Sequence, residues 1–270
     1  VGDPAPPEVE AIERVRDPID AFVLEKLEQS DLTFAPEASL SVLAQRVHQQ
    51  LTGLPLRWER LQQLLESEDP QAFDYFIDEL LDSSAFGERW ARSWLDLARY
   101  ADSNGLDENL ALGEAWRYRD YVIRSFNDDK PYNQFLTEQI AGDEIDAGDR
   151  GRLAISYYRV GPWEADNMMS KHRRQDYLND ITSNIGSAFL GLTIGCARCH
   201  DHKFDPIPQR DYYRLAAVFK DAYDEHDWLK PQGPRTLKYV TPAERTAWEA
   251  HTAQINQQVE PLKKKIEAEQ

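Results

Sequence analysis

The chain has 270 residues, of which 41% are hydrophobic and 11% aromatic, a length and composition that suit either one large domain or one domain plus an appendage. Aspartate and glutamate (48) outnumber lysine and arginine (31), which gives a net charge of −17 at pH 7. Nucleic acid and anionic membrane surfaces are therefore excluded as expected partners, because binding to either depends on clustered positive charge.

Residues 1–16 are rich in proline and acidic side chains, which predicts a linker or extended arm. The pair Asp17 and Pro18 is typical of a helix start, with Asp as the N-cap and Pro at the first helical position. Apolar residues at helical spacing, separated by turn-forming residues, predict further helices. These cover residues 39–51, 58–65, 70–81, 85–100, 115–126, 132–140, 173–190 and 209–221. Residues 151–161 fit either a strand or a helix.

The C-terminal stretch carries a heptad pattern. Its apolar residues follow one another at intervals of 7, 4, 3 and 4, as in the seam of a coiled coil. They are Trp248, Ile255, Val259, Leu262 and Ile266. This pattern predicts a long helical arm over 241–270, whose seam needs a partner helix from a neighbouring domain or from a second copy. No convincing period-2 pattern occurs in the chain, so the predicted fold class is all-α.

The two cysteines of the chain are three residues apart, and a histidine follows at once: Cys196, Cys199 and His200. Random placement would give this string on the order of once in six thousand chains of this composition. Two thiols one helical turn apart can add to the two vinyl groups of one porphyrin, and the adjacent imidazole can bind the iron as proximal ligand. The motif therefore predicts one covalent haem c, with thioether bonds from both cysteines and His200 as metal ligand.

Three other interpretations of the motif stay open. Cys196 and Cys199 could bind a structural metal such as zinc together with His202 or His226, although zinc sites usually pair two such knuckles. A redox-active C-x-x-C pair normally adjoins a βαβ pattern, which this chain lacks. The cysteines could also form a plain disulfide or be unused thiols.

The sixth ligand of the iron is expected from outside residues 196–210, because the chain turns at Pro206 and Pro208, too soon to reach the opposite face of the porphyrin. The candidates are His226, Met168, Met169 and His172. His226 is favoured, since the helix before it can return the chain to the haem edge, whereas methionine is a common ligand that raises the potential. An open, five-coordinate iron is the alternative. His202 suits a supporting role beside the proximal ligand.

These features divide the chain into a Pro-rich linker (1–16), a multi-helix domain around a c-type haem (17–234) and a coiled-coil-like helical arm (235–270).

Several segments resemble a known family, the second planctomycete-type cytochrome c domain, long catalogued as a domain of unknown function. The similar segments occur in the order of the family and span roughly residues 17–228. They are residues 19–27, 51–55, 87–92, 98–105, 116–123, 189–206 and 211–213. The resemblance is weaker just after Pro55 and over 152–170, so Met168 and Met169 gain no support from it.

The resemblance implies a large secreted or envelope protein, with another cytochrome-type domain before this one and a connection through the arm to a further domain. We therefore expect a periplasmic or secreted c-type cytochrome domain that exchanges electrons with a redox partner domain or protein, rather than a stand-alone enzyme. The alternatives are a haem-dependent oxidoreductase acting on carbohydrate, suggested by the family's polysaccharide-degrading setting, and a metal-binding structural module. No window approaches the roughly 20 apolar residues of a membrane-spanning helix, so no transmembrane segment is expected in this chain.

Overall fold

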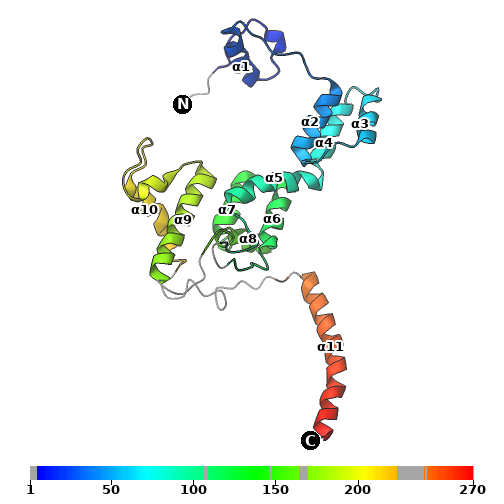
Figure 1. The fold of residues 1–270 in the computed structure, drawn as a ribbon, viewed down its shortest axis with the longest axis vertical. Helices are drawn as coiled ribbons and strands as arrows, with labels where there is room; N and C mark the ends of the chain where they lie inside the picture. Colours follow the sequence, from blue (N-terminus) through cyan, green and yellow to red (C-terminus); the bar gives the residue numbers. More distant parts are fainter. Residues whose placement is uncertain are drawn as a thin grey trace. The chain divides into compact units, whose positions relative to one another are not determined.

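The computed structural model describes residues 5–105, 109–145, 148–163, 170–223, 240 and 242–269, and it consists of helices joined by loops (Figure 1). Within these ranges the only β-structure is an isolated bridge between Ser103 and Ala111. The predicted all-α fold class is thereby confirmed. The chain divides into two compact units, Val1–Leu81 and Asp82–Gln270. The domain boundaries drawn from the sequence at residues 16 and 234 stay predictions.

The first unit begins with the short 3-10 helix η1 (Ile12–Arg14). Its α-helices are α1 (Pro18–Glu28), α2 (Leu40–Thr52), α3 (Trp58–Leu65) and α4 (Ala72–Leu81). The start of α1 is as predicted. The carboxylate of Asp17 accepts hydrogen bonds from the backbone N–H groups of Ile19 and Asp20, and the Asp20 side chain accepts one in return from the Asp17 N–H. α2 ends at Gly53, whose φ of 72° is the left-handed conformation that glycine adopts most readily.

A small apolar core joins the last three helices of this unit. Its buried members are Ala44, Leu61, Leu64, Phe76 and Leu80. Helices of 8–13 residues are marginal by themselves in water. The burial of this face is therefore what holds α2, α3 and α4 together.

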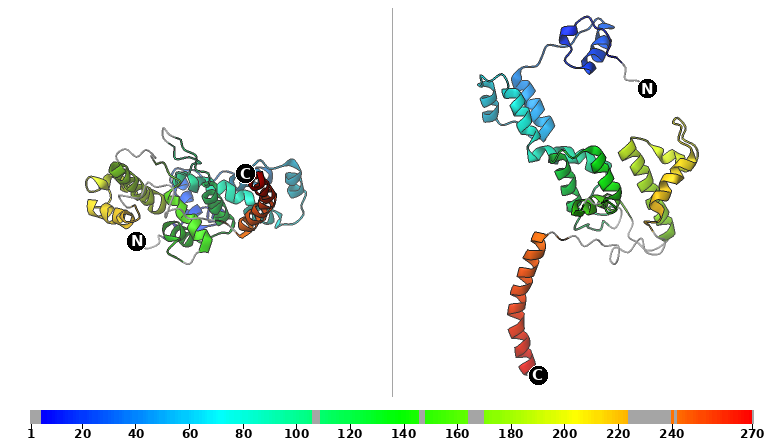
Figure 2. Two further views of the ribbon diagram at one scale, coloured as in Figure 1. Left: turned by 90° about the horizontal axis from the view of Figure 1, so that it is seen from below. Right: turned by 180° about the vertical axis from the view of Figure 1, so that it is seen from behind.

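The second unit contains the larger core. Its elements are α5 (Ser84–Leu97), α6 (Trp116–Asn127), α7 (Tyr132–Ala141), α8 (Gly148–Ala154), η2 (Ile155–Tyr158), α9 (Ser170–Leu190), η3 (Ile194–Arg198), α10 (Gln209–Lys220) and α11 (Pro242–Glu269). The segment 151–161, which fitted a strand or a helix by sequence, is helical through η2. α9 and α10 lie side by side in Figures 1 and 2, and η3 packs against both.

Trp94 of α5 lies at the centre of the larger core. Its ring meets Phe135 of α7 and Phe189 of α9 edge-on, with centroids 4.8 and 5.5 Å away. Its indole Nε1 donates to the Tyr118 hydroxyl over 3.1 Å and to Gln139 Oε1 over 2.9 Å, so this buried polar atom is satisfied. Because Phe189 lies in the last turn of α9, the helix that leads to the C-x-x-C-H motif, these contacts fix that helix to the rest of the unit.

α11 is the long C-terminal helix predicted from the heptad pattern (Figure 2). Near its start, Glu244 Oε1 pairs with Arg117 Nη2 of α6 over 2.9 Å. None of the helices that the structure describes has both the length and the apolar character required to cross a bilayer.

Candidate functional site

The C-x-x-C-H motif lies on and just after η3, the helical turn that follows α9. Gly191, with φ of +65°, comes directly after α9 and allows the chain to change direction there. The chain then packs back on α9, so that a Cβ atom at Gly186 would lie only 2.6 Å from Cγ1 of Ile194. The missing side chain at Gly186 therefore sets how closely the turn approaches α9.

One side of η3 is anchored in a small apolar cluster. Ile194 and Ala197 of the turn are buried together with Tyr212 of α10, and Ile207 and Leu215 pack around them. Because the buried pair is three residues apart, it marks one side of a turn with three residues per repeat. The turn is therefore held between α9 and α10, and its remaining side chains face outward.

Cys196 and Cys199 are both exposed, and they are free thiols rather than a disulfide. The backbone N–H of Cys199 donates to the carbonyl of Cys196 over 3.3 Å and closes the turn. At this spacing the two side chains lie one above the other on the same side. The turn therefore presents two accessible thiols to one side, which is the state that thioether formation requires.

His200 is exposed, and a backbone carbonyl orients its ring. Nδ1 lies 2.8 Å from the carbonyl oxygen of Asp201. A carbonyl can only accept a hydrogen bond, so this contact assigns the proton to Nδ1. The other nitrogen, Nε2, then carries the lone pair that can bind a metal, and a carbonyl on the distal N–H is a usual partner of metal-bound histidine.

Three side chains to which the sequence analysis gave no role fix the backbone of the motif. Asp201 Oδ1 accepts from the backbone N–H of Gln209, the first residue of α10, over 2.7 Å. Gln209 Nε2 and the Tyr213 hydroxyl both donate to the carbonyl of Arg198, over 3.1 and 3.0 Å. These bonds tie the motif to the first turn of α10. Isolated polar residues such as these make no periodic pattern; Asp201 and Tyr213 lie in segments that resemble the family, whereas Gln209 lies outside them.

His202 supports the loop that follows the motif. Its side chain is only 7% exposed, and its Nδ1 accepts the backbone N–H of Asp205 over 3.0 Å. Its own backbone N–H donates to the carbonyl of Ile207 over 2.9 Å. These contacts make His202 an organiser of the turn over 202–207.

Arg198 places a positive charge beside the motif. Its guanidinium hydrogen-bonds the sulfur of Cys199, and this contact together with the attraction between the two groups raises the pKa of Arg198. The side chain is otherwise exposed to solvent.

The structure does not bring all the predicted ligands together. His172 is exposed on the first turn of α9 and lies about 21 Å along the helix axis from Gly186, at 1.5 Å per residue. The other candidates for the sixth ligand, Met168, Met169 and His226, lie outside the described residues.

Among the residues with described positions, no three His, Cys, Asp or Glu side chains converge in a way that could hold a metal ion. Cys196, Cys199 and His202 are all described. The zinc set that joins His202 to the two thiols therefore does not form in this structure, and the set with His226 lies partly outside it.

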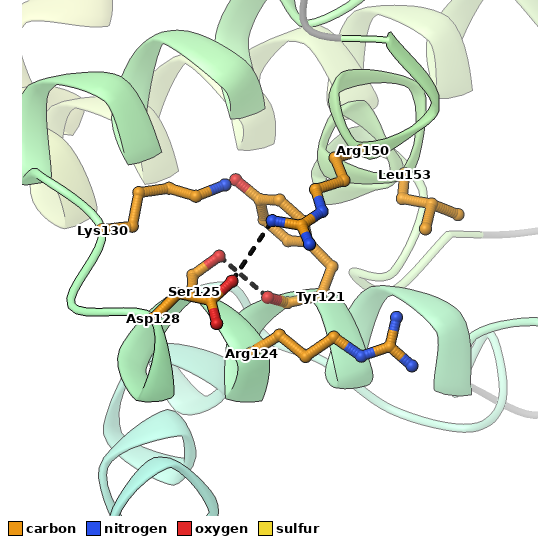
Figure 3. Close-up of a pocket in the computed structure, with 7 residues that line it drawn as sticks. All are labelled: Tyr121, Arg124, Ser125, Asp128, Lys130, Arg150 and Leu153. Carbon is orange, nitrogen blue, oxygen red and sulfur yellow. Dashed lines mark hydrogen bonds and ion pairs between the residues drawn. The ribbon is translucent and has the colours of Figure 1, made fainter. Parts of the chain in front are cut away.

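A separate polar pocket lies between α6 and α8 (Figure 3). Its lining residues are Tyr121, Arg124, Ser125, Asp128, Lys130, Arg150 and Leu153. Arg150 Nη1 pairs with Asp128 Oδ2 over 3.2 Å, and Lys130 pairs with the buried Glu138 of α7. None of the residues predicted to bind haem or metal lines this pocket.

Comparison with known proteins gives one match. The family model described as PSCyt2, protein of unknown function (DUF1549), matches residues 18–224, from the start of α1 to just beyond α10. No curated protein and no solved structure matches the chain.

Proposed function

The chain belongs to the PSCyt2 family, and from this premise we propose that it is a c-type cytochrome domain. One haem c is attached through Cys196 and Cys199, and His200 binds its iron. The domain exchanges electrons with a redox partner domain or protein, within a larger periplasmic or secreted protein. The name of the family is consistent with a cytochrome, and the residues of the C-x-x-C-H motif support the same function.

The observation that carries the proposal is the state of the three side chains. The contact between His200 Nδ1 and the Asp201 carbonyl leaves Nε2 available, and the two cysteines of the motif are exposed and do not form a disulfide. A backbone carbonyl that accepts from the ring N–H opposite the ligating nitrogen is the arrangement that metal-bound histidine usually shows. Covalent haem attachment uses two thiols to form thioether bonds and one imidazole to bind the iron, so the donor set fits the cofactor.

Attachment is an addition that needs no external oxidant or reductant. Each cysteine S–H adds across one vinyl C=C bond: the sulfur forms a C–S bond to one vinyl carbon, and the hydrogen goes to the other. Asp201 keeps His200 in the tautomer whose Nε2 donates to iron. Gln209 and Tyr213 hold the backbone of the turn in place, both for the two thiols and for His200. When bound, the haem supplies one-electron exchange between ferrous and ferric iron.

The direct test is expression in a host with haem-attachment machinery. Denatured wild-type protein should be heavier by one haem in intact-mass spectra, and the reduced protein should show the α band of a c-type cytochrome. Replacing both thiols, C196A/C199A, should remove the added mass. H200A should keep the added mass but change the spectrum, whereas H251A, an exposed histidine of α11, should change neither.

An unmodified mass from a host that matures a reference cytochrome would overturn the proposal. In that case one equivalent of zinc per chain, lost in C196A/C199A, would support the metal-binding structural module instead.

A further inference from the structure

α11 exposes a continuous apolar seam. In heptad notation Trp248, Ile255 and Leu262 take the d positions, and Thr252, Val259 and Ile266 take the a positions. The side chains of Trp248, Ile255, Leu262 and Ile266 are 66%, 44%, 57% and 58% exposed. Nothing among the described residues covers this seam.

Pro261 marks the opposite side of the same helix. It lies inside α11, where it cannot donate the backbone hydrogen bond to the carbonyl of Gln257. Position 261 is a c position and 257 an f position, so the missing bond lies on the face away from the seam. A helix that packs along one side curves with its outer face toward solvent. The proline is therefore placed where packing along the seam tolerates it.

The seam residues pair best with a second α11 in the antiparallel direction. With a-to-d′ layers centred on residue 257, Trp248 packs on Ile266 of the second copy, Thr252 on Leu262 and Ile255 on Val259. Every layer then joins a larger side chain to one that leaves room for it. A parallel pair would instead stack Trp248 on Trp248 and Thr252 on Thr252, and it would place β-branched Ile255 at d, which two-stranded parallel coils disfavour.

The flanking charges select the same direction. In the antiparallel register the e positions face each other, so Glu249 meets Lys263 of the second copy, and the symmetry repeats this pair. In the parallel register Glu249 would instead face Glu244 of the second copy, a like-charge contact. Both Glu249 and Lys263 are exposed, and the described partner of Lys263 is Glu260, at 3.7 Å on the same helix. Among the remaining flanking pairs, Asn256 and Gln258 each face the same residue of the second copy, and these pairs are uncharged. His251 faces position 265 of the second copy, a lysine.

We propose that α11 is a homodimerisation element: two copies of the chain associate through an antiparallel, two-stranded coiled coil with Glu249–Lys263 ion pairs at both ends. The interface is isologous, with its two-fold axis at residue 257. It uses no residue of the C-x-x-C-H turn, so it stands or falls independently of haem attachment.

The test uses charge reversal in the full chain, followed by sedimentation equilibrium. Wild type should be dimeric. E249K creates two Lys–Lys contacts and K263E two Glu–Glu contacts, so each should weaken association by at least about tenfold. An equimolar mixture of the two single variants should form heterodimers, and the double variant E249K/K263E should regain the wild-type dimer. E260K, a charge reversal at an outer b position, is the matched control and should leave association unchanged.

Circular dichroism of the single variants should match that of wild type, which separates lost pairing from lost folding. A wild-type chain that stays monomeric at every accessible concentration would overturn the proposal. Dimerisation that is unchanged in E249K and K263E would also overturn it, as would the absence of heterodimers in the mixture of the two variants. Both outcomes contradict the antiparallel register, because only that register pairs position 249 with 263.

Discussion

Lys130 and Glu138 form an ion pair whose side chains are only 7% and 3% exposed. Burial alone would raise the pKa of the Glu138 carboxyl, but hydrogen bonds from Lys130, Tyr121 and Gln134 outweigh it and lower that pKa. A carboxyl whose pKa is lower in the folded state stabilises the fold above its unfolded pKa. The contribution is lost as the pH falls through the folded value, so it is present at neutral pH and disappears in acid.

Removing one partner of this pair should therefore be costly. K130M leaves a buried carboxylate without its cation, and we expect a loss of about 3–5 kcal/mol of unfolding free energy at pH 7. The double variant K130M/E138L should recover most of it, since both charges are then gone. Urea denaturation measures both values. The cost of K130M should shrink as the pH falls through the folded pKa of Glu138, and a pH-independent cost would show that the charge is not its cause.

Gly186 and Gly195 offer a matched pair at the candidate site. A methyl group at Gly186 would lie 2.6 Å from Ile194 Cγ1, whereas one at Gly195 would meet nothing closer than Ser183 Oγ at 3.7 Å. We expect G186A to destabilise the protein by about 1–3 kcal/mol, because the turn is forced off α9. G195A should be nearly neutral. The shift of the denaturation midpoint from wild type measures both effects, and equal shifts for G186A and G195A would contradict the close packing of the turn on α9.

The proposed sixth ligand can be tested by alanine substitution of the individual candidates. The sequence favours His226, and the structure places His172 far along α9 from the turn. If His226 binds the iron, H226A should convert a low-spin absorption spectrum into a high-spin one, while H172A should leave it unchanged. A low-spin spectrum in H226A would move the assignment to Met168 or Met169, and a high-spin spectrum in wild type would indicate an open iron.

At the scale of the elements, local signals predicted the helices but not always the faces they bury. The start of α1 follows from Asp17 and Pro18, because capping depends only on neighbouring residues. Helical spacing does not by itself tell which residues of this helix are buried: Ile19 is 71% exposed, and the buried residues are Ala21 and Leu24. Periodicity shows that a helix has an apolar face, but what covers that face depends on contacts distant in sequence.

The candidate site divides in the same way. Cys196, Cys199 and His200 could be predicted, since their chemistry resides in their spacing. Gln209 and Tyr213 could not, because they act through hydrogen bonds to a carbonyl on another element. Asn104, outside the candidate site, likewise acts through contacts distant in sequence. It is fully buried, and its side chain hydrogen-bonds the backbone at Leu110 and at Trp163.

Deletion of residues 241–270 tests whether α11 is independent of the site. One described contact between α11 and the rest of the second unit is the Arg117–Glu244 pair, and an ion pair with one exposed partner contributes about 1 kcal/mol or less. The shortened chain should therefore carry haem in the same proportion as the full chain, measured by absorbance per polypeptide. Loss of haem on deletion would show that the arm is part of the folded core.

At the scale of the whole molecule, each of the two units has its own apolar core. Phe76 is buried among α2, α3 and α4, and F76A should cost the first unit about 3–5 kcal/mol. The second unit should keep its haem absorbance and its near-UV aromatic signal from Trp94. The matched variant F135A, in the larger core, should instead weaken both of these signals while the first unit stays folded. Simultaneous loss of both signals in F76A would indicate a single cooperative unit.

The bracing of η3 by Gly186, Gln209 and Tyr213 has a consequence for the order of assembly. The described contacts that position the turn come from α9 and α10, so, if the proposed function holds, the scaffold can form before a haem is attached. If such a scaffold folds in an oxidising compartment, as the proposed location implies, its two neighbouring thiols can form a disulfide before a porphyrin binds. The yield of mature protein would then depend less on folding than on how long a cell keeps Cys196 and Cys199 reduced.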